Sequence, residues 1–312
     1  MGKIVAICVS KQKGLQKEEV PFANVIKAHG IEGDAHAGEW HRQISFLDKE
    51  DIEEFKKKGA EVINGSFGEN FIVENLHVKD LKVGTLLKSG EVVFEITQKG
   101  KSCHDHCAIY YKMGECIMPK YGTFARVISS GTIKKGADIE VIERDKPFPF
   151  QAAVITLSDK GFKGEREDVS GPTIVNKLKE LNYEVAEQIL LPDNKELLKK
   201  ELMRLADQRQ VDLILTTGGT GFSPRDITPE ATLEVMDRNA PGIAEAIRAE
   251  SMKYTKHAML SRGMSVIRKK TLIINLPGSP KACLESIEVF KDALPHAIKL
   301  LRDEVSECAR KD

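Results

Sequence analysis

Short apolar runs separated by glycine-containing turns make up the first half of the chain. Each run spans only a few residues and is bounded by turn formers, which predicts strands rather than long helices. Strands are expected at 3–9, 43–47, the end of 65–73, on both sides of the Ser89–Gly90 turn within 81–97, 124–128 and 139–142. A charged helix is expected at 48–58 and a loop at 25–38. Many short strands with few helices predict a mostly β, barrel-like domain.

The pattern changes after residue 150. Strands are expected at 152–157, 185–190, 213–217, 266–268 and 272–276. Helices are expected at 172–181, 194–208, 232–236, 243–254, 282–291 and 295–304. Strands that alternate with helices predict an α/β domain with a mainly parallel sheet.

A domain boundary is expected in the segment Arg144–Phe150, which reads RDKPFPF. Its two prolines cannot donate to a strand ladder, and the segment shows no hydrophobic periodicity. We therefore predict two domains, 1–146 and 147–312.

Charge and cysteine usage narrow the class of protein. Lys and Arg number 47, as do Asp and Glu, and this balance argues against a protein held on nucleic acid by phosphate contacts. No apolar run approaches the ~20 residues of a membrane span, and no signal-peptide cleavage site follows the N-terminal strand, so we expect a cytoplasmic protein. Six cysteines in 312 residues do not form a disulfide scaffold, and we expect thiols, ligands or catalysts.

One stretch, Leu213–Thr232, reads LILTTGGTGFSPRDITPEAT and has the form strand, glycine loop, helix. The helix would begin at Thr228–Pro229, with Thr228 as a capping residue. In open α/β sheets this arrangement binds anions, because bare backbone N–H groups point at the ligand. Asp226 in the same loop would repel a phosphate unless a cation such as Mg²⁺ lies between them. A plain β–α turn is the alternative, and the candidate binding residues are Gly218, Gly219, Thr220 and Gly221.

Polar residues also follow the other predicted strands of this half. Asp193 comes after one strand, where a helix cap is the alternative role because Glu196 completes a capping pattern. Ser158 and Asp159 end the first strand, where capping by Ser158 is equally compatible. The last strand ends in a turn formed by Pro277, Gly278 and Ser279. This turn either only ends the strand or lies at the same carboxyl edge of the sheet as the other candidate residues.

This half resembles the MogA/MoaB family of molybdenum-cofactor biosynthesis proteins. The resemblance rests on TTGGTG with RDITPEAT, on TLSDKGFKGEREDVSGP, on LLPDN and on LSRGMSVIRKKTLIINLPGSPKA. It implies a three-layer α/β fold and transfer of AMP from ATP to molybdopterin with release of pyrophosphate. It also implies that Asp193 and Asp226 are the catalytic pair, holding Mg²⁺ or orienting the attacking phosphate. Members of the family are usually trimeric, so we expect a homo-oligomer. We also expect other cofactor-biosynthesis proteins as partners, and neither nucleic acid nor a membrane.

Two other functions remain open for this half. Some MoaB-like relatives keep the fold without clear activity, so the chain is also compatible with a non-catalytic carrier of molybdopterin or molybdenum cofactor. A nucleotide pyrophosphatase of the CinA type carries a similar TTGG loop, although RDITPEAT fits the MogA pattern better.

The N-terminal half contains a cysteine-rich segment, KSCHDHCAIYYKMGECIMPKYG. Its three cysteines and two histidines are compatible with Zn²⁺, although the spacing matches no common zinc ribbon. Buried, unreactive thiols are a second interpretation. The cysteines are Cys103, Cys107 and Cys116, and the histidines are His104 and His106.

A third interpretation comes from the resemblance of HGIEGDAHAG, GSFGENF, the cysteine segment and GTFARVISSGTIKKGADIEVI to a MOSC domain. MOSC domains are thought to bind molybdenum cofactor or to carry sulfur on a single cysteine. Cys103 best fits that position, since Lys101 nearby would favour the thiolate. Cys107 and Cys116 depart from the single-cysteine pattern and remain alternatives.

The same resemblance implies ligand-loop roles for three further residues, Asp34, His36 and Arg126. A structural turn is at least as compatible with the Gly33–Asp34 pair, which commonly forms turns. Arg126 lies in a predicted strand, where a solvated outward side chain is the alternative to contact with an anionic ligand.

Overall fold

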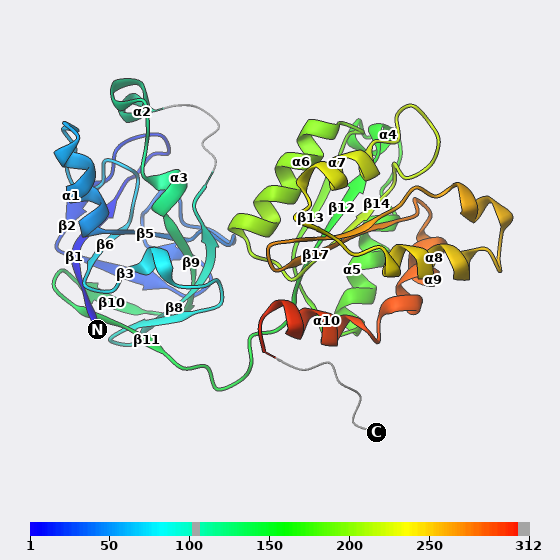
Figure 1. Cartoon of the computed structure of the whole chain (residues 1–312). Coiled ribbons are helices and arrows are strands. Elements are labelled where there is room, and N and C mark those ends of the chain that lie inside the picture. The colour runs from blue at the N-terminus through cyan, green and yellow to red at the C-terminus, as the bar shows by residue number, and fades with distance from the viewer. Residues whose placement is uncertain (102–106, 305–312) are drawn as a thin grey trace. The chain divides into compact units, whose positions relative to one another are not determined.

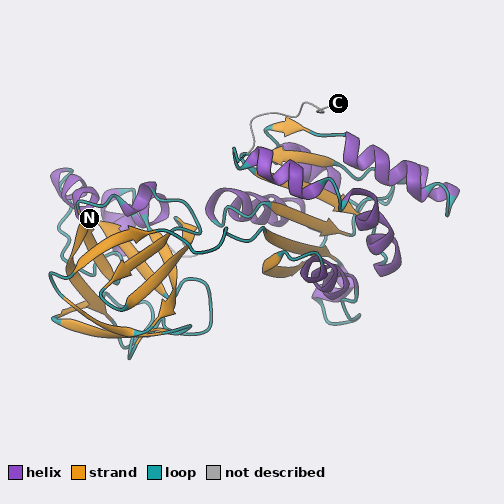
Figure 2. Cartoon of the chain, turned by 90° about the horizontal axis from the view of Figure 1, so that it is seen from below, coloured by secondary structure: helices purple, strands orange, loops and turns teal. Residues whose placement is uncertain are grey.

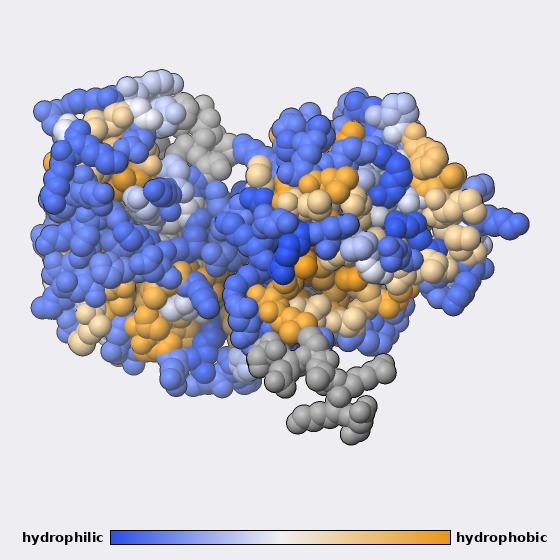
Figure 3. Space-filling model, viewed as in Figure 1, coloured by the Kyte–Doolittle hydropathy of each residue, from blue (hydrophilic) through white to orange (hydrophobic). Residues whose placement is uncertain are grey.

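The computed structural model describes residues 1–101 and 107–304 (Figure 1). The chain divides into two compact units, Met1–Phe148 and Pro149–Asp312, so the division falls within the proline-containing segment. Each unit has its own clusters of buried apolar side chains. In the view of Figure 3 hydrophilic residues cover most of the visible face, with smaller hydrophobic areas between them. Within the described residues, no helix combines the length and the apolar character that crossing a bilayer requires.

The N-terminal unit is built on a closed barrel of seven strands, which confirms the barrel-like prediction. The order around the barrel is β1-β11-β7-β8-β9-β5-β6, and pairing of β11 with β1 closes it. Because closure pairs every strand on both sides, the barrel has no free edge. Its strands are β1 (Gly2–Val9), β5 (Ile44–Asp48), β6 (Phe71–Glu74), β7 (Leu86–Ser89), β8 (Val92–Lys99), β9 (Thr123–Ser129) and β11 (Asp138–Ile142).

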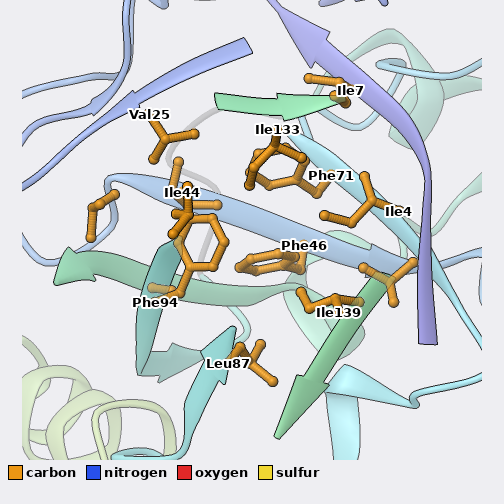
Figure 4. Close-up of a cluster of buried hydrophobic side chains, with 14 of the residues drawn as sticks. Ile4, Ile7, Val25, Ile44, Phe46, Phe71, Leu87, Phe94, Ile133 and Ile139 are labelled. Carbon is orange, nitrogen blue, oxygen red and sulfur yellow. The ribbon is translucent and has the colours of Figure 1, made fainter. Parts of the chain in front are cut away.

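Aromatic and branched side chains fill the barrel interior (Figure 4). Phe46 packs on Phe71 with ring centroids 5.4 Å apart and meets Phe94 edge-on at 5.3 Å. All three rings are fully buried. Inward side chains alternate with outward ones along a strand, so the period-two apolar pattern produces this core.

Short elements surround the barrel. Strand β2 (Glu18–Val20) pairs with β1, and β3 (Phe22–Ile26), β4 (Gly30–Ile31) and β10 (Gly131–Lys134) form a separate small sheet. The prediction of an uninterrupted loop at 25–38 is therefore wrong, because Val25 and Ile26 pair with Ile31 and Gly30 of β4. The helical segments are α1 (Lys49–Lys57), η1 (Val78–Asp80), α2 (Ala108–Met113) and α3 (Met118–Tyr121).

The C-terminal unit contains one six-stranded sheet in the order β13-β12-β14-β17-β16-β15 (Figure 1). The first four strands of that order are mutually parallel, which confirms the expected parallel sheet. The last two are antiparallel additions at one edge. The strands are β12 (Gln151–Leu157), β13 (Glu184–Leu191), β14 (Leu213–Thr217), β15 (Arg238–Asn239), β16 (Ser265–Arg268) and β17 (Thr271–Leu276).

Helices pack on both faces of this sheet (Figure 2). Ala152 and Val154 of β12 belong to the cluster formed with α5, α8, α9 and α10, whereas Ala153 and Ile155 belong to the cluster formed with α6 and α7. Alternate residues of one strand thus bury opposite faces, as a parallel sheet requires. The helices are α4 (Asp159–Phe162), α5 (Ser170–Glu180), α6 (Lys195–Met203), α7 (Thr228–Val235), α8 (Gly242–Ser251), α9 (Pro280–Phe290) and α10 (Leu294–Leu301), with η3 at Lys256–Leu260.

Two helix ends differ from the prediction. The helix expected at 194–208 is α-helical only to Met203 and continues as a π-helical turn, η2 (Arg204–Gln208). Thr228 does not cap α7, since Ile227 occupies the capping position without a side-chain bond. Instead, the Thr228 hydroxyl donates to the carbonyl of Gly218 at 2.8 Å. The residue expected to begin the helix therefore stabilises the glycine loop.

Candidate active site

Four parallel strands end at the same edge of the C-terminal sheet. Strands β12, β13, β14 and β17 are neighbours, so the segments that follow them leave the sheet side by side. In open α/β sheets ligands bind at this carboxyl edge. Here the edge carries a pocket of about 720 Å³. Of the candidate residues, those that line it are Ser158, Asp159, Asp193, Gly218, Gly219, Asp226 and Gly278.

The glycine loop after β14 has a conformation that side chains would prevent. Gly218 has φ +94°, and a Cβ there would lie 2.4 Å from the carbonyl oxygen of Leu157. Gly219 has φ +64°, and its Cβ would lie 2.5 Å from the hydroxyl oxygen of Thr228. Within the part of the chain that the structure describes, no group accepts a hydrogen bond from the amides of Gly219, Thr220 or Gly221. The loop therefore offers backbone donors to an anion.

Replacing Gly219 by alanine is expected to destabilise the C-terminal unit by about 1–3 kcal/mol, because a left-handed residue would gain a Cβ that meets Thr228. Thermal unfolding measures the effect. Gly242→Ala is the matched control, since a Cβ there meets nothing within 4 Å. Equal stability of the two variants would show that the glycine loop tolerates a side chain at position 219.

Asp193 and Asp159 hold each other by reciprocal hydrogen bonds. The Asp159 amide donates to Asp193 Oδ2 at 3.1 Å, and the Asp193 amide donates to Asp159 Oδ1 at 3.0 Å. These bonds join the segments after β12 and β13. The capping role considered for Asp193 belongs to its neighbour, because the Asn194 side chain accepts from the amide of Leu197. Asp193 is thus left to face the pocket.

Asp226 lies close to the same loop on the other side. Its Oδ2 accepts from the amide of Ser223 at 3.1 Å and would lie 2.8 Å from a Cβ on Gly221. Asp193 Oδ1 would lie 3.5 Å from a Cβ on Gly219. The two acidic side chains, distant in sequence, therefore both approach the glycine loop and line one pocket.

The acidic side chains give the pocket a marked electrostatic character. Burial raises the pKa of the Asp193 carboxyl above its ordinary value, and the charges of Asp159 and Asp226 add to this effect. The amide of Asp193 and the guanidinium of Arg225 hold the pKa of Asp159 below its usual range. A cation entering the pocket would relieve this crowding of negative charge.

Several pocket residues were not predicted as site residues. Arg225 forms an ion pair with Asp159, and Arg166 Nη2 donates to Ser158 Oγ at 3.2 Å. Asp168 accepts from the Gly171 amide at 2.9 Å, and its neighbours Arg166 and Glu167 also line the pocket. All lie within the segments that carry the family resemblance. The direction in which these side chains point depends on tertiary folding, so the sequence pattern does not show it. Only Arg225 had a local indication, because it directly precedes Asp226.

The other candidate residues have structural contacts. Ser158 and Ser279 cap α4 and α9 by accepting from the amides of Gly161 and Ala282. The carbonyl of Pro277 accepts from Thr217 Oγ1 at 2.6 Å and from Cys283 Sγ at 3.0 Å. Thr220, Gly221, Pro277 and Ser279 border the pocket without being among the residues that line it.

The N-terminal unit has a pocket of about 700 Å³ on one side of the barrel. Cys107 and Cys116 line it, and so do His36 and four cationic side chains, Lys17, Arg42, Lys101 and Lys112. The guanidinium of Arg42 lies 4.8 Å from the ring centroid of Trp40, which also lines the pocket. Cations beside an aromatic ring suit a planar anionic ligand. Three of the five residues considered as zinc ligands, Cys103, His104 and His106, lie outside the described residues.

Two ligand-loop candidates of this unit make internal contacts. Asp34 is buried and accepts from Lys17 Nζ at 2.7 Å and from Asn70 Nδ2 at 2.9 Å. Arg126 pairs with Glu95 at 2.8 Å. Neither is among the residues that line the pocket, whereas His36 is. Asp34 thus holds two residues of the pocket wall, since Lys17 and Asn70 both line the pocket.

Comparison with known proteins adds an independent line of evidence. Residues 153–296 match the model of a family described as "Probable molybdopterin binding domain", and residues 33–140 match that of the MOSC domain. A molybdopterin adenylyltransferase of Helicobacter pylori (strain J99 / ATCC 700824) is 43% identical over 150 residues, covering 47% of this chain and 85% of that protein. The molybdenum cofactor synthesis protein cinnamon of Drosophila melanogaster is 43% identical over 155 residues, covering 49% of this chain. The chain spans only 26% of the length of that Drosophila protein.

Among solved structures, the molybdopterin biosynthesis enzyme MoaB from Thermus thermophilus is 48% identical, with a TM-score of 0.48. The match covers 49% of this chain and 97% of that one. The family matches confirm both resemblances inferred from the sequence.

Proposed function

The chain belongs to the molybdopterin-binding family through its C-terminal unit and carries a MOSC domain in its N-terminal unit, and on this basis we propose that it acts in molybdenum-cofactor biosynthesis. In this proposal the C-terminal unit transfers AMP from ATP to the terminal phosphate of molybdopterin and releases pyrophosphate. One observation carries it: Asp193 and Asp226 line the same pocket as the bare glycine loop. Curated relatives with 37–43% identity are molybdopterin adenylyltransferases.

The residues of the pocket divide the task in the way that phosphoryl transfer requires. The reaction depends mainly on positioning and on neutralising charge. The amide of Gly219 donates to phosphate oxygens, and Arg225 and Arg166 add positive charge at the same pocket. Asp193 and Asp226 would hold Mg²⁺ against the triphosphate or orient the attacking phosphate.

Magnesium fits the donor set of this pocket. The described residues contain no group of three or more His, Cys, Asp or Glu side chains that could hold a metal ion by themselves. Mg²⁺ commonly binds through one or two carboxylates together with water and substrate phosphates. Asp193 and Asp226 would supply the carboxylates, and the ion would neutralise the triphosphate.

Incubating the full chain with molybdopterin, ATP and Mg²⁺ tests this function. Formation of adenylylated molybdopterin with release of pyrophosphate is the expected result. Pyrophosphate release without molybdopterin would favour a nucleotide pyrophosphatase instead. Molybdopterin binding without any turnover would favour a carrier. Each outcome excludes the other two.

We expect AMP transfer to depend on pH, and we expect the Mg²⁺ concentration to shift that dependence. Because the pKa of Asp193 is raised, a proton competes with Mg²⁺ for this carboxylate at a pH above the usual range of aspartate. Activity should therefore be present above that pKa and be lost as the pH falls through it. Profiles of kcat/KM against pH at low and high Mg²⁺ measure this, and high Mg²⁺ should move the acidic limb to lower pH. An acidic limb that does not move with the Mg²⁺ concentration would show that Asp193 does not bind the metal.

We propose that the N-terminal unit binds molybdopterin or molybdenum cofactor, or carries sulfur on a cysteine of its pocket. Trp40 is the only tryptophan of the chain and lines this pocket, so its fluorescence reports on this unit. Titrating the full chain with molybdopterin should change that fluorescence, and Arg42→Gln should weaken the binding. Trp40→Phe is the control that removes the signal. No spectral change, together with no binding heat, would contradict the proposal.

A further inference from the structure

Arg262 makes several hydrogen bonds to the segment that joins the glycine loop to α7. Its Nε donates to the carbonyl of Gly221 at 2.7 Å, and its Nη2 donates to the carbonyl of Asp226 at 2.6 Å. Its own amide donates to the carbonyl of Thr220 at 2.9 Å. Its Nη1 forms an ion pair with Glu230 in the first turn of α7. One residue therefore contacts both ends of the segment Thr220–Asp226.

Of the partners of Arg262, only Asp226 lines the pocket at the carboxyl edge of the sheet, here called the nucleotide pocket. Arg262 itself does not line it and instead lines a separate cavity of about 300 Å³. Its bonds to the loop go to backbone carbonyls, so the amide N–H groups and the Asp226 carboxylate stay available to the pocket. Any effect on the reaction must therefore act through the loop.

We infer that Arg262 is a positioning residue that fixes the spacing between the glycine amides and the Asp226 carboxylate, and this inference rests on the proposed function of the pocket. Holding the carbonyl groups of Gly221 and Asp226 on one rigid group orients both peptide planes at once. A displacement of about 1 Å at a reacting group can cost a hundredfold in rate. The rest of the segment is held by local hydrogen bonds and by the ion pair of Arg225 with Asp159, and residues 222–225 are exposed.

Only arginine among the side chains can make this set of contacts. Its guanidinium presents donors in a fixed planar fork, whereas the lysine ammonium is a single point on a flexible stem. Arg262→Lys keeps the charge toward Glu230 but cannot reach both carbonyls in the same orientation. A loss of activity in Arg262→Lys would therefore come from lost positioning of the loop and not from a lost charge.

A matched control lies at the other end of α7. Arg268 donates to the carbonyl of Val235 at 2.8 Å and pairs with Asp207 at 2.5 Å, so it also combines a backbone carbonyl with a carboxylate. It does not line the nucleotide pocket. Arg268→Lys should change stability without changing the metal dependence.

The test compares Arg262→Lys, Arg262→Gly and Arg268→Lys with the parent chain. For Arg262→Lys we expect kcat/KM for ATP to fall about 10- to 100-fold, with a rise in the Mg²⁺ concentration that gives half-maximal activity. Millimolar guanidinium should partly restore Arg262→Gly. Unchanged kinetics in Arg262→Lys, or the same loss in Arg268→Lys, would overturn the inference.

Hydrogen exchange gives a readout that does not need activity. The amides of Ser223, Asp226 and Thr228 are hydrogen-bonded within the loop, and they should exchange faster in Arg262→Lys than in Arg268→Lys. An inactive parent chain would refute the proposed function while leaving this comparison intact. An active parent chain with unchanged loop exchange in Arg262→Lys would refute the positioning role alone.

Discussion

Replacing Asp226 by asparagine is expected to abolish AMP transfer, which means a loss of at least about 10²–10³-fold in kcat. Asparagine has nearly the same shape, and its amide oxygen can still accept from the amide of Ser223. The change therefore removes the negative charge and keeps the loop. Asp193→Asn should have an effect of the same order, because that side chain lines the same pocket. Both losses follow if the two carboxylates hold the metal or orient the attacking phosphate.

The affinity for molybdopterin distinguishes catalysis from binding. In both variants the dissociation constant of molybdopterin should change little, since the pterin does not depend on either carboxylate in this proposal. Titration calorimetry with the full chain measures it. Asp237→Asn serves as the control, because Asp237 is exposed and accepts only from the amide of Lys269 among the contacts described. Full activity in both single variants would remove the basis for the assignment.

The carboxyl edge of the C-terminal sheet could be predicted because four of its strands are parallel, with β12 between β13 and β14. A residue that follows one strand then lies near residues that follow its neighbours. This rule brought Asp159, Asp193 and Gly218 to one pocket from positions far apart in sequence. It needed only the hydrophobic pattern and the assumption of a parallel sheet. The same rule did not separate pocket residues from capping residues such as Ser279.

Contacts that depend on side-chain direction could not be predicted in this way. Arg262 contacts the loop from the segment before β16, and Arg225 within the loop pairs with Asp159, but the pattern at neither position shows the direction of the side chain. Thr228 has the sequence of a helix cap, yet its hydroxyl donates to the carbonyl of Gly218, and Ile227 occupies the capping position. The barrel was predictable as a class, but β4 has only two residues, too few for a periodic signal, and it pairs with β3 across a short turn.

In the N-terminal unit, replacing Asp34 by asparagine is expected to lower the free energy of unfolding by about 3–5 kcal/mol, because it leaves the buried Lys17 ammonium without its partner. Lys17 and Asp34 have side chains only 1% and 2% exposed. Burial would raise the pKa of Asp34, but hydrogen bonds from His36 and the charge of Lys17 outweigh this and lower it. The carboxylate thus stabilises the fold above the ordinary aspartate pKa, and this stability is lost as the pH falls through the lowered value.

Denaturant unfolding followed by Trp40 fluorescence measures this effect in the N-terminal unit alone, since Trp40 is the only tryptophan. Adding Lys17→Met to Asp34→Asn should recover most of the loss, because the double variant removes both charges of the Lys17–Asp34 pair. Glu61→Gln is the control for an exposed pair, Lys112–Glu61, and should leave the transition unchanged. If Asp34 instead served only to bind a ligand, Asp34→Asn would weaken binding and leave unfolding unaltered. The double variant therefore decides whether this loop aspartate belongs to the barrel or to its ligand.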